Sequence, residues 1–211
     1  MTDAGELLGM PSENSLSPLF DETELTPFYQ SLIDRIRQED TTNWIFFEPR
    51  YGGPANGSRS WLGPFNDPRP GRARLAYYPH LYSVRLEAGN RYDPDLDVTL
   101  TNWEAARRVE LAAQNMPMAI GEFGLARRTE NWELFLDRTL AMADRMLAGW
   151  AYWSYDPGDW GIIEGPERTE TPYANVLTRP YARAVAGTPT SMGYDPQTGA
   201  FHLEFVEHEG V

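Results

Sequence analysis

Residues 118–124 read Met-Ala-Ile-Gly-Glu-Phe-Gly, a short apolar run followed by a glutamate between two glycines. The apolar run is typical of a short strand that is buried on both faces. Glycines allow the backbone to turn sharply and allow a ligand to approach it closely. Glu122 is therefore interpreted either as a functional carboxylate at the end of a buried strand or as a solvated side chain in a strand-to-helix turn.

Three similar apolar runs occur elsewhere in the chain, at residues 44–47, 75–78 and 150–153. Each run is short enough to be a buried strand, and each is followed by polar or aromatic residues. We therefore expect four strands in all, with the polar residues gathered at their carboxyl ends.

Helices are predicted between these strands. Thr26-Pro27 looks like an N-cap followed by proline at the first helical position, and it predicts a helix over 27–39. Thr101-Asn102-Trp103-Glu104 fits a capping box and predicts a helix that ends near residue 115. Apolar residues at helical spacing predict a third helix over 131–147.

The alternation of helices and strands predicts an α/β protein with a parallel sheet. Both α/β barrels and doubly wound sheets place their chemistry at the carboxyl ends of the strands. No glycine-rich phosphate loop follows any of the runs, which argues against a doubly wound protein with an unrelated cofactor. A turn at residues 195–199 between two alternating runs predicts a hairpin over 192–206.

Composition excludes several classes of function. The 211 residues have a formal net charge of −13, which disfavours nucleic acid and anionic membranes as partners. The chain has no cysteine, so disulfides, thiolate metal sites and cysteine nucleophiles are excluded. All 18 basic residues are arginine, so Schiff-base and P-loop lysine chemistry is excluded as well.

Three further polar side chains follow the strands at 44–47 and 75–78. Glu48 could act with Glu122 as a pair of carboxylates in glycoside hydrolysis, or it could be held by the neighbouring Arg50. His80 and Tyr82 lie two residues apart in an extended segment, so they share a face and are candidates for one binding site.

Trp153 and Tyr155 end the fourth strand, a position that is typical of aromatic platforms under a ligand. Asp93, Asp95 and Asp97 have the spacing of a calcium loop but lack the glycine at its sixth position, so no metal site is predicted.

Together these motifs resemble glycoside hydrolase family 5, and within it the endoglycoceramidase-like branch. Gly121-Glu122-Phe123-Gly124 is similar to the segment that ends barrel strand seven of that family, and His80-Leu81-Tyr82 is similar to the His-x-Tyr of strand six. Residues 45–49 and Trp153 resemble strands five and eight, and residues 179–189 resemble the exit from the barrel into a C-terminal β-domain.

The resemblance implies a partial (β/α)8 barrel, strands five to eight, over residues 25–187. Residues 1–24 are expected to be an irregular N-terminal segment, and 188–211 the start of a β-sandwich-like domain. A full barrel needs about 250 residues. We therefore expect the chain to be the C-terminal half of such an enzyme, as a truncated gene, an internal start at Met1, or a split partner of the missing N-terminal half.

The resemblance also implies a retaining glycoside hydrolase without a cofactor, acting on a glycan or on a glycolipid such as a glycosylceramide. Glu122 would be its nucleophile, with Tyr82 orienting it and His80 beside them. Trp153 would stack on the sugar, and Glu48 and Tyr155 would contribute to substrate binding. The family's acid/base, the glutamate of an Asn-Glu-Pro motif, is not in this sequence.

Three further expectations follow. The family resemblance implies secretion, although the first residues do not form a signal peptide. The loop at 50–74, with Trp61 and Phe65, would shape the aglycone side. Two alternatives stay open: a compact hydrolase that uses Glu48 as its acid/base, and a non-catalytic carbohydrate- or lipid-binding remnant.

Overall fold

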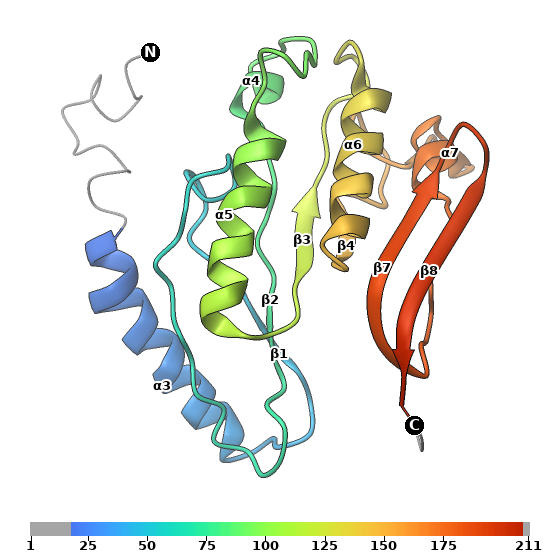
Figure 1. The fold of residues 1–211 in the computed structure, drawn as a ribbon. Helices are drawn as coiled ribbons and strands as arrows, with labels where there is room; N and C mark the ends of the chain where they lie inside the picture. The colour runs from blue at the N-terminus through green and yellow to red at the C-terminus, as the bar shows by residue number, and fades with distance from the viewer. Residues whose placement is uncertain (1–17, 209–211) are drawn as a thin grey trace, which may run out of the picture. The chain divides into compact units, whose positions relative to one another are not determined.

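The computed structural model describes residues 18–208 (Figure 1). The chain divides into two compact units, one formed by residues 1–81 and 101–121 and the other by 82–100 and 122–211. The chain passes from the first unit to the second within one strand, at Gly121–Glu122. No helix among the described residues is long and apolar enough to cross a membrane.

The first unit is built on two parallel strands, β1 (Ile45–Phe47) and β2 (Leu75–Tyr77). Their register places Phe47 opposite Tyr77, and Tyr77 forms a parallel bridge to Met118 at the start of the next strand. The parallel order follows from the long connections between these short strands, as the sequence predicts. β2 is buried, as predicted, but the expected burial of both faces of β1 is wrong, because Phe46 is 55% exposed.

Helix α3 (Thr26–Arg37) packs on β1 through Ile33, which is buried, and through Tyr29, whose ring meets Phe47 edge-on. The helix was predicted over 27–39, but Thr26 is not its N-cap. A π-helical turn, η1 (Asp21–Leu25), runs directly into α3, and the Thr26 hydroxyl donates to the carbonyl of Asp21.

The irregular segment expected over residues 1–24 lies for the most part outside the described residues. From residue 18 onward that expectation is wrong, because the chain is helical up to the end of α3. Buried Asp21 explains the order of this turn, since its carboxylate accepts hydrogen bonds from the Ser60 hydroxyl and the Trp61 backbone N–H.

Helix α5 (Thr99–Gln114) follows the second strand and confirms the helix that was predicted near 102–115. The predicted capping box at Thr101 is wrong, because the helix begins two residues earlier. The carboxylate of Asp97 accepts the backbone N–H of Thr99 and the hydroxyl of Ser83, and so it takes over the capping role. Ser83 in turn caps the short helix α4 (Val84–Glu87).

The second unit contains the end of β3 (Ala119–Phe123), which pairs with β4 (Gly149–Tyr152). Between them lies α6 (Trp132–Arg145), whose buried face includes Leu136, Leu140 and Ala143, as its spacing predicts. Leu147, predicted on the same face, instead follows the helix with a φ of 51° and is partly exposed.

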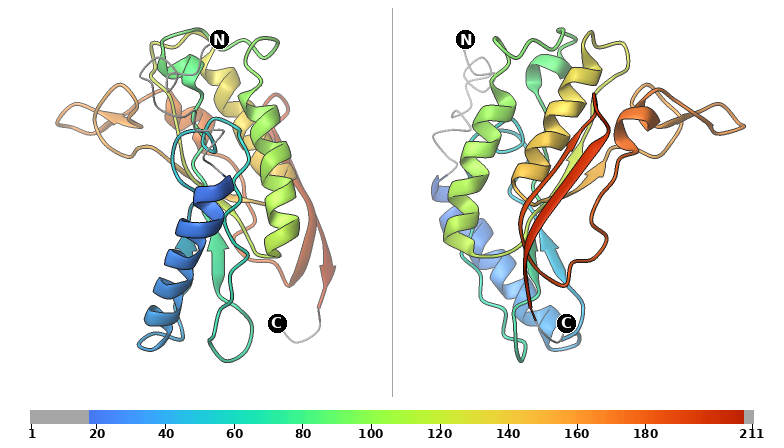
Figure 2. Two further views of the ribbon diagram at one scale, coloured as in Figure 1. Left: turned by 90° about the vertical axis from the view of Figure 1, so that its left-hand side faces the viewer. Right: turned by 45° about the vertical axis from the view of Figure 1, so that its right-hand side comes forward.

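The rest of the second unit begins with two short antiparallel strands, β5 (Ile163–Glu164) and β6 (Thr169–Glu170), and the helix α7 (Tyr173–Leu177). Then β7 (Gly187–Asp195) and β8 (Ala200–Glu207) form the predicted hairpin, a long ribbon in both views of Figure 2.

Arg179 links the hairpin to α6. Arg179 donates to the carboxylate of Asp144 at the end of α6, 3.0 Å away, and its guanidinium lies over the ring of Tyr194 in β7. Burial raises the pKa of Asp144, and the charge of Arg179 acts in the opposite direction.

Candidate active site

Glu122 lies near the carboxyl end of β3, where the second unit begins. The hydroxyl of Tyr82 donates to its carboxylate, with Oη 3.0 Å from Oε2. Tyr82 is buried and Glu122 is half-buried, so the tyrosine is fixed while the acid keeps access to solvent. The hydrogen bond fixes the direction of the carboxylate, as a nucleophile requires.

Gly124 follows Glu122 by two residues and lets the end of β4 approach closely. A Cβ at this position would lie 2.4 Å from the carbonyl oxygen of Trp153, a contact that no real side chain makes. The backbone N–H of Trp153 donates to Phe123, 2.9 Å away, which completes the pairing of the two strand ends. The glycines on either side of the glutamate are therefore required by close approach of neighbouring strands.

Trp153 follows β4 directly, and 51% of its surface is exposed. Tyr155 is also exposed, but the guanidinium of Arg168 lies over its ring. Two aromatic residues were predicted to end the fourth strand. Trp153 has a half-exposed ring, whereas the ring of Tyr155 is in contact with the guanidinium of Arg168.

Trp160 belongs to the same group of side chains and was not among the predicted site residues. Its ring lies 6.0 Å from that of Tyr82, and a Cβ on Gly124 would come within 3.2 Å of it. Its backbone carbonyl accepts the hydroxyl of Tyr152. The available signal for Trp160 was its place in the loop after the predicted strand at 150–153. Nothing in the sequence shows that this loop folds back to Tyr82.

Two buried phenols support this end of the second unit. Burial raises the pKa of Tyr173 to about 12, and its hydroxyl donates to the carbonyl of Leu125. Burial also raises the pKa of Tyr152. Both phenols therefore stay neutral donors at any physiological pH.

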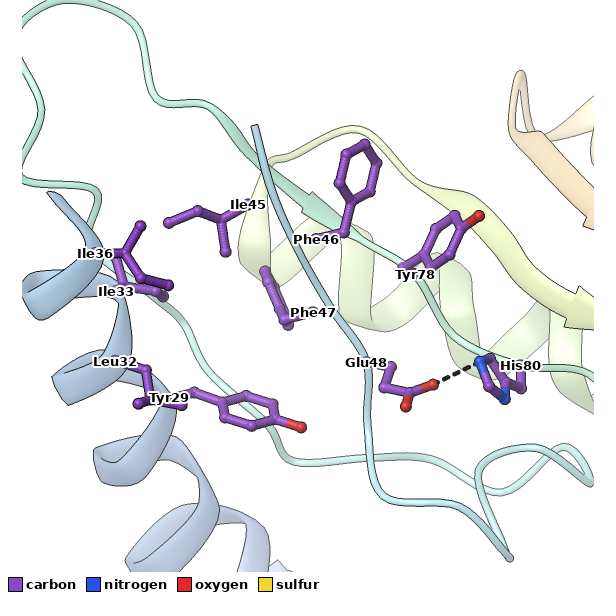
Figure 3. A pocket seen from close by; sticks show the side chains of 10 residues that line it. All are labelled: Tyr29, Leu32, Ile33, Ile36, Ile45, Phe46, Phe47, Glu48, Tyr78 and His80. Atoms are coloured by element: carbon purple, nitrogen blue, oxygen red, sulfur yellow. Dashed lines mark ion pairs between the residues drawn. The ribbon is translucent and has the colours of Figure 1, made fainter. Parts of the chain in front are cut away.

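In the first unit, Glu48 and His80 form an ion pair at the ends of β1 and β2, with 2.7 Å between Oε2 and Nε2 (Figure 3). Arg50, which the sequence offers as a partner of Glu48, has its guanidinium 3.6 Å from the carboxylate of Asp21. Parallel pairing of β1 with β2 explains the contact, since it brings the residues after both strands to the same edge.

The loop after β1 is fixed by buried charges. The carboxylate of Glu110 in α5 accepts the Ser60 backbone N–H and the Tyr77 hydroxyl, and Arg107 pairs with it. Arg107 also donates to the carbonyls of Pro54 and Ser58. The loop is therefore an ordered part of the first unit.

The two aromatic residues expected to face an aglycone in this loop are both engaged within the first unit. Phe65 packs on Phe47, with ring centroids 4.6 Å apart, and is part of the apolar packing under α3. The guanidinium of Arg59 lies over the ring of Trp61.

Among residues 18–208 no cluster of three or more histidine, aspartate or glutamate side chains is arranged to hold a metal ion. Asp93 and Asp97, which have calcium-loop spacing in the sequence, hold backbone N–H groups of their own loop.

A strand–helix protein with a carboxylate at a strand's carboxyl end and aromatic rings beside it has the features of an α/β-barrel glycosidase. Sequence comparison agrees with this class. The chain matches the Cellulase family (glycosyl hydrolase family 5) over residues 6–159 and the glycoside hydrolase family 5 C-terminal domain over residues 179–211. The chain belongs to glycoside hydrolase family 5.

Among solved structures, the chain is similar to endo-glycoceramidase II from Rhodococcus sp. In its ganglioside GM3 complex the identity is 37% and the TM-score 0.79, covering 87% of this chain and 42% of that one. In the lactosyl-enzyme intermediate the identity is 37% and the TM-score 0.76, covering 87% and 41%. This chain therefore spans less than half the length of those proteins.

A more distant structure shares the fold alone. The family 5 xyloglucanase from Paenibacillus pabuli is 16% identical with a TM-score of 0.56, covering 71% of this chain and 52% of that one. No curated protein sequence matches the chain significantly.

Proposed function

We propose that this chain supplies the nucleophile of a retaining glycoside hydrolase that acts on a glycan or a glycolipid. The observation that carries the proposal is the hydrogen bond from Tyr82 to Glu122 at the carboxyl end of β3. It gives a half-buried carboxylate a fixed orientation. Membership of glycoside hydrolase family 5 supports the same reaction class.

The proposed reaction has two steps. In the first, a carboxylate oxygen of Glu122 forms a bond to the anomeric carbon, and the bond from that carbon to the leaving oxygen breaks. An acid protonates the leaving oxygen. In the second step the conjugate base of that acid activates water, which displaces Glu122 and restores the original configuration. The acid is a second carboxyl group that the complete protein would supply, since the Asn-Glu-Pro motif is not in this sequence.

The substrate class follows from the relatives and from the aromatic surface. The solved structures of endo-glycoceramidase II include a ganglioside GM3 complex and a lactosyl-enzyme intermediate. We propose a lactose-based glycolipid for this chain, with the exposed ring of Trp153 stacked on the sugar and His80 in contact with it. Tyr155 and Glu48 complete the set of substrate-binding residues.

The first unit exposes a surface that an additional part of the barrel would cover. In the described residues β1 is paired with β2 on one edge. On α3, the side chains of Phe28, Leu32 and Ile36 form a stripe at helical spacing and are 54%, 42% and 41% exposed. Ile33, on the same helix, is buried.

A groove of about 370 Å³ runs between this stripe and β1 (Figure 3). We propose that strand four occupies the groove in the complete protein, which makes α3 the helix after strand four and β1, β2, β3 and β4 barrel strands five to eight. Residues 188–211 would then begin the C-terminal β-domain. We also propose that the complete protein is secreted, as its family resemblance implies.

Covalent trapping tests the nucleophile. A dinitrophenyl 2-deoxy-2-fluoro-lactoside has a leaving group that departs without an acid, so it can label the chain as it stands. Intact-mass spectrometry should show one lactosyl adduct, and peptide mapping should place it on Glu122. The adduct should be absent in Glu122→Gln. An adduct of unchanged yield in that variant would refute the assignment.

Hydrolysis and binding assays, together with the labelling experiment, separate the alternatives. If Glu48 acts as acid/base, the chain alone should hydrolyse lactosylceramide, and Glu48→Gln should stop hydrolysis while the fluorolactoside still labels Glu122. If the chain is a non-catalytic remnant, it should bind lactose without forming an adduct.

Exposure of the α3 stripe also makes a prediction about assembly. Expressed alone, the chain should associate, because an unpaired strand edge beside an apolar stripe favours further pairing. A single monomeric species in analytical ultracentrifugation, with cooperative melting, would contradict the open-edge proposal but would leave the nucleophile untouched.

A further inference from the structure

The direction of the Glu122 carboxylate depends on where the Tyr82 side chain places its hydroxyl. This hydroxyl donates to Oε2 of Glu122 over 3.0 Å. When a tyrosine side chain turns about its Cα–Cβ bond, the hydroxyl moves through a longer arc than the ring atoms, so the hydrogen bond requires a ring that is held in place. The ring of Tyr82 lies 6.0 Å from that of Trp160, at an interplanar angle of 59°. Trp160 is therefore a candidate for a side chain that holds it.

The backbone of Trp160 is anchored to the neighbouring strand β4. The hydroxyl of Tyr152, the last residue of that strand, donates to the Trp160 carbonyl, 2.9 Å away. Burial raises the pKa of Tyr152, so this phenol stays a neutral donor at physiological pH. The loop that carries the tryptophan is thus tied to the strand that ends beside the candidate site.

The backbone on both sides of this tryptophan is fixed in the same way. The carbonyl of Asp159 accepts the backbone N–H of Arg127, 3.0 Å away, and the guanidinium of Arg127 donates to the carbonyl of Gly158. On the other side, the carbonyl of Gly161 accepts the hydroxyl of Thr171, also at 3.0 Å. The loop is therefore ordered along its length and can hold a side chain that packs against it.

The indole ring itself is placed by a missing side chain. A Cβ on Gly124 would lie 3.2 Å from Cε3 of Trp160, closer than ordinary van der Waals contact. Gly124 is two residues after Glu122, so the indole packs on the backbone beside the carboxylate. There it meets the ring of Tyr82, which is buried. The tyrosine ring thus has a rigid aromatic neighbour.

We propose that Trp160 is a positioning residue, which holds the ring of Tyr82 so that its hydroxyl meets the carboxylate of Glu122. All three side chains belong to the second unit. The proposal rests on the proposed function, because that function makes Glu122 the nucleophile. It gives the two tryptophans of the site different roles: Trp153 stacks on the sugar, whereas Trp160 acts through Tyr82 and does not contact the sugar.

The kinetics of labelling by the fluorolactoside test this role. Trp160→Leu removes the aromatic neighbour and should lower the maximal rate of labelling of Glu122 about tenfold, because the donor to the carboxylate is less well placed. The concentration for half-maximal labelling should stay within about twofold of the wild type, since no sugar contact is lost. In a Tyr82→Phe background the same substitution should change the rate less than about twofold, because the hydroxyl that Trp160 positions is already absent.

Trp160→Phe is the conservative variant, because it keeps an aromatic ring against Tyr82, and it should label within about threefold of the wild-type rate. Trp150→Leu is the matched control, since Trp150 is a partly buried tryptophan of the same unit whose ring packs edge-on against Phe123. It should label at the wild-type rate. An unchanged rate in Trp160→Leu, an equal loss in Trp150→Leu, or a loss that persists in Tyr82→Phe would overturn the proposal.

A spectroscopic measurement decides the question if no adduct forms. The chain has eleven tyrosines, so ¹³Cζ-labelled tyrosine gives a small set of signals, and that of Tyr82 is assigned by its loss in Tyr82→Phe. Glu122→Gln should move this signal, because the hydroxyl then donates to a neutral amide. In Trp160→Leu the same change should move it less than about half as far. Equal displacements would refute the positioning role, whereas a missing adduct in the wild type would refute only the proposed function.

Discussion

The hydroxyl of Tyr82 lies 3.0 Å from the carboxylate of Glu122, although the two residues are forty positions apart in the chain. Both belong to the second unit, and the contact is made by a buried donor and a half-buried acceptor. This relationship gives a single side chain the means to control the direction of the proposed nucleophile.

Tyr82→Phe removes the hydroxyl and keeps the ring. The rate at which the fluorolactoside labels Glu122 should fall about 100-fold, which is the usual effect of losing one preorganised hydrogen-bond donor. The concentration for half-maximal labelling should change little, because the ring contact with Trp160 is retained. Tyr181→Phe, at an exposed tyrosine of the same unit, is the control and should label at the wild-type rate.

Trp153→Ala tests the exposed aromatic platform. Lactose affinity measured by calorimetry should fall about tenfold, equivalent to roughly 1.4 kcal/mol. Stability should change by less than about 0.5 kcal/mol, because the ring is half exposed. Trp44→Ala removes a tryptophan of similar exposure from the first unit, and it should leave the affinity unaltered. Equal losses in both variants would show that Trp153 is not a specific platform.

Gly124→Ala tests the close approach of β4. The added Cβ would meet the Trp153 carbonyl at 2.4 Å, and backbone atoms cannot move aside as a flexible side chain can. We expect a loss of about 2–3 kcal/mol in the free energy of unfolding by urea. Gly89→Asn should cost much less, because no atom lies within 4 Å of that position and asparagine tolerates its positive φ. Similar costs for both would refute the packing argument.

Asp67 predicts a pH dependence of stability in the first unit. Burial acts to raise its pKa, but hydrogen bonds from Arg37 and from the backbone N–H groups of Arg74 and Arg69 outweigh burial and lower the pKa below 3.8. Because the folded pKa is the lower one, the stabilisation is present at neutral pH. It is lost as the pH falls below 3.8 through the folded value.

Asp67→Asn should therefore destabilise the first unit at pH 7 by about 3 kcal/mol, since it leaves the buried guanidinium of Arg37 unpaired. It should also flatten the decline of stability in acid. Urea unfolding at a series of pH values measures both effects. Glu39→Gln, which breaks the exposed pair with Arg35, should cost less than about 1 kcal/mol. An acid profile of Asp67→Asn that parallels the wild type would contradict the prediction.

The strands and helices could be predicted because local patterns determine them. Short apolar runs with polar ends became β1 to β4, and the apolar stripe at residues 131–147 became α6. Helix starts were less predictable. The acceptor that caps α5 is Asp97, which lies outside the helix, and Thr101 offered an equally good local motif.

Candidate site residues could be proposed where a local pattern marks them, but contacts that depend on strand register could not. His80 and Tyr82 were proposed from their spacing, and Glu122 from its flanking glycines. The partner of Glu48 depends on β1 and β2 being parallel neighbours, which no local pattern specifies, so the adjacent Arg50 seemed equally suitable. Trp160 was missed for the same reason, because it reaches Tyr82 through a returning loop.

The buried charges under the loop after β1 have a consequence for recognition. Glu110 and Arg107 form hydrogen bonds with the backbone at Pro54, Ser58 and Ser60. This loop therefore loses its conformational entropy when the unit folds. A ligand that touches the loop meets a ready-made surface and has no ordering cost to offset there. Selectivity at this surface would then come from shape, and a poorly matched ligand could not recruit the loop by induced fit.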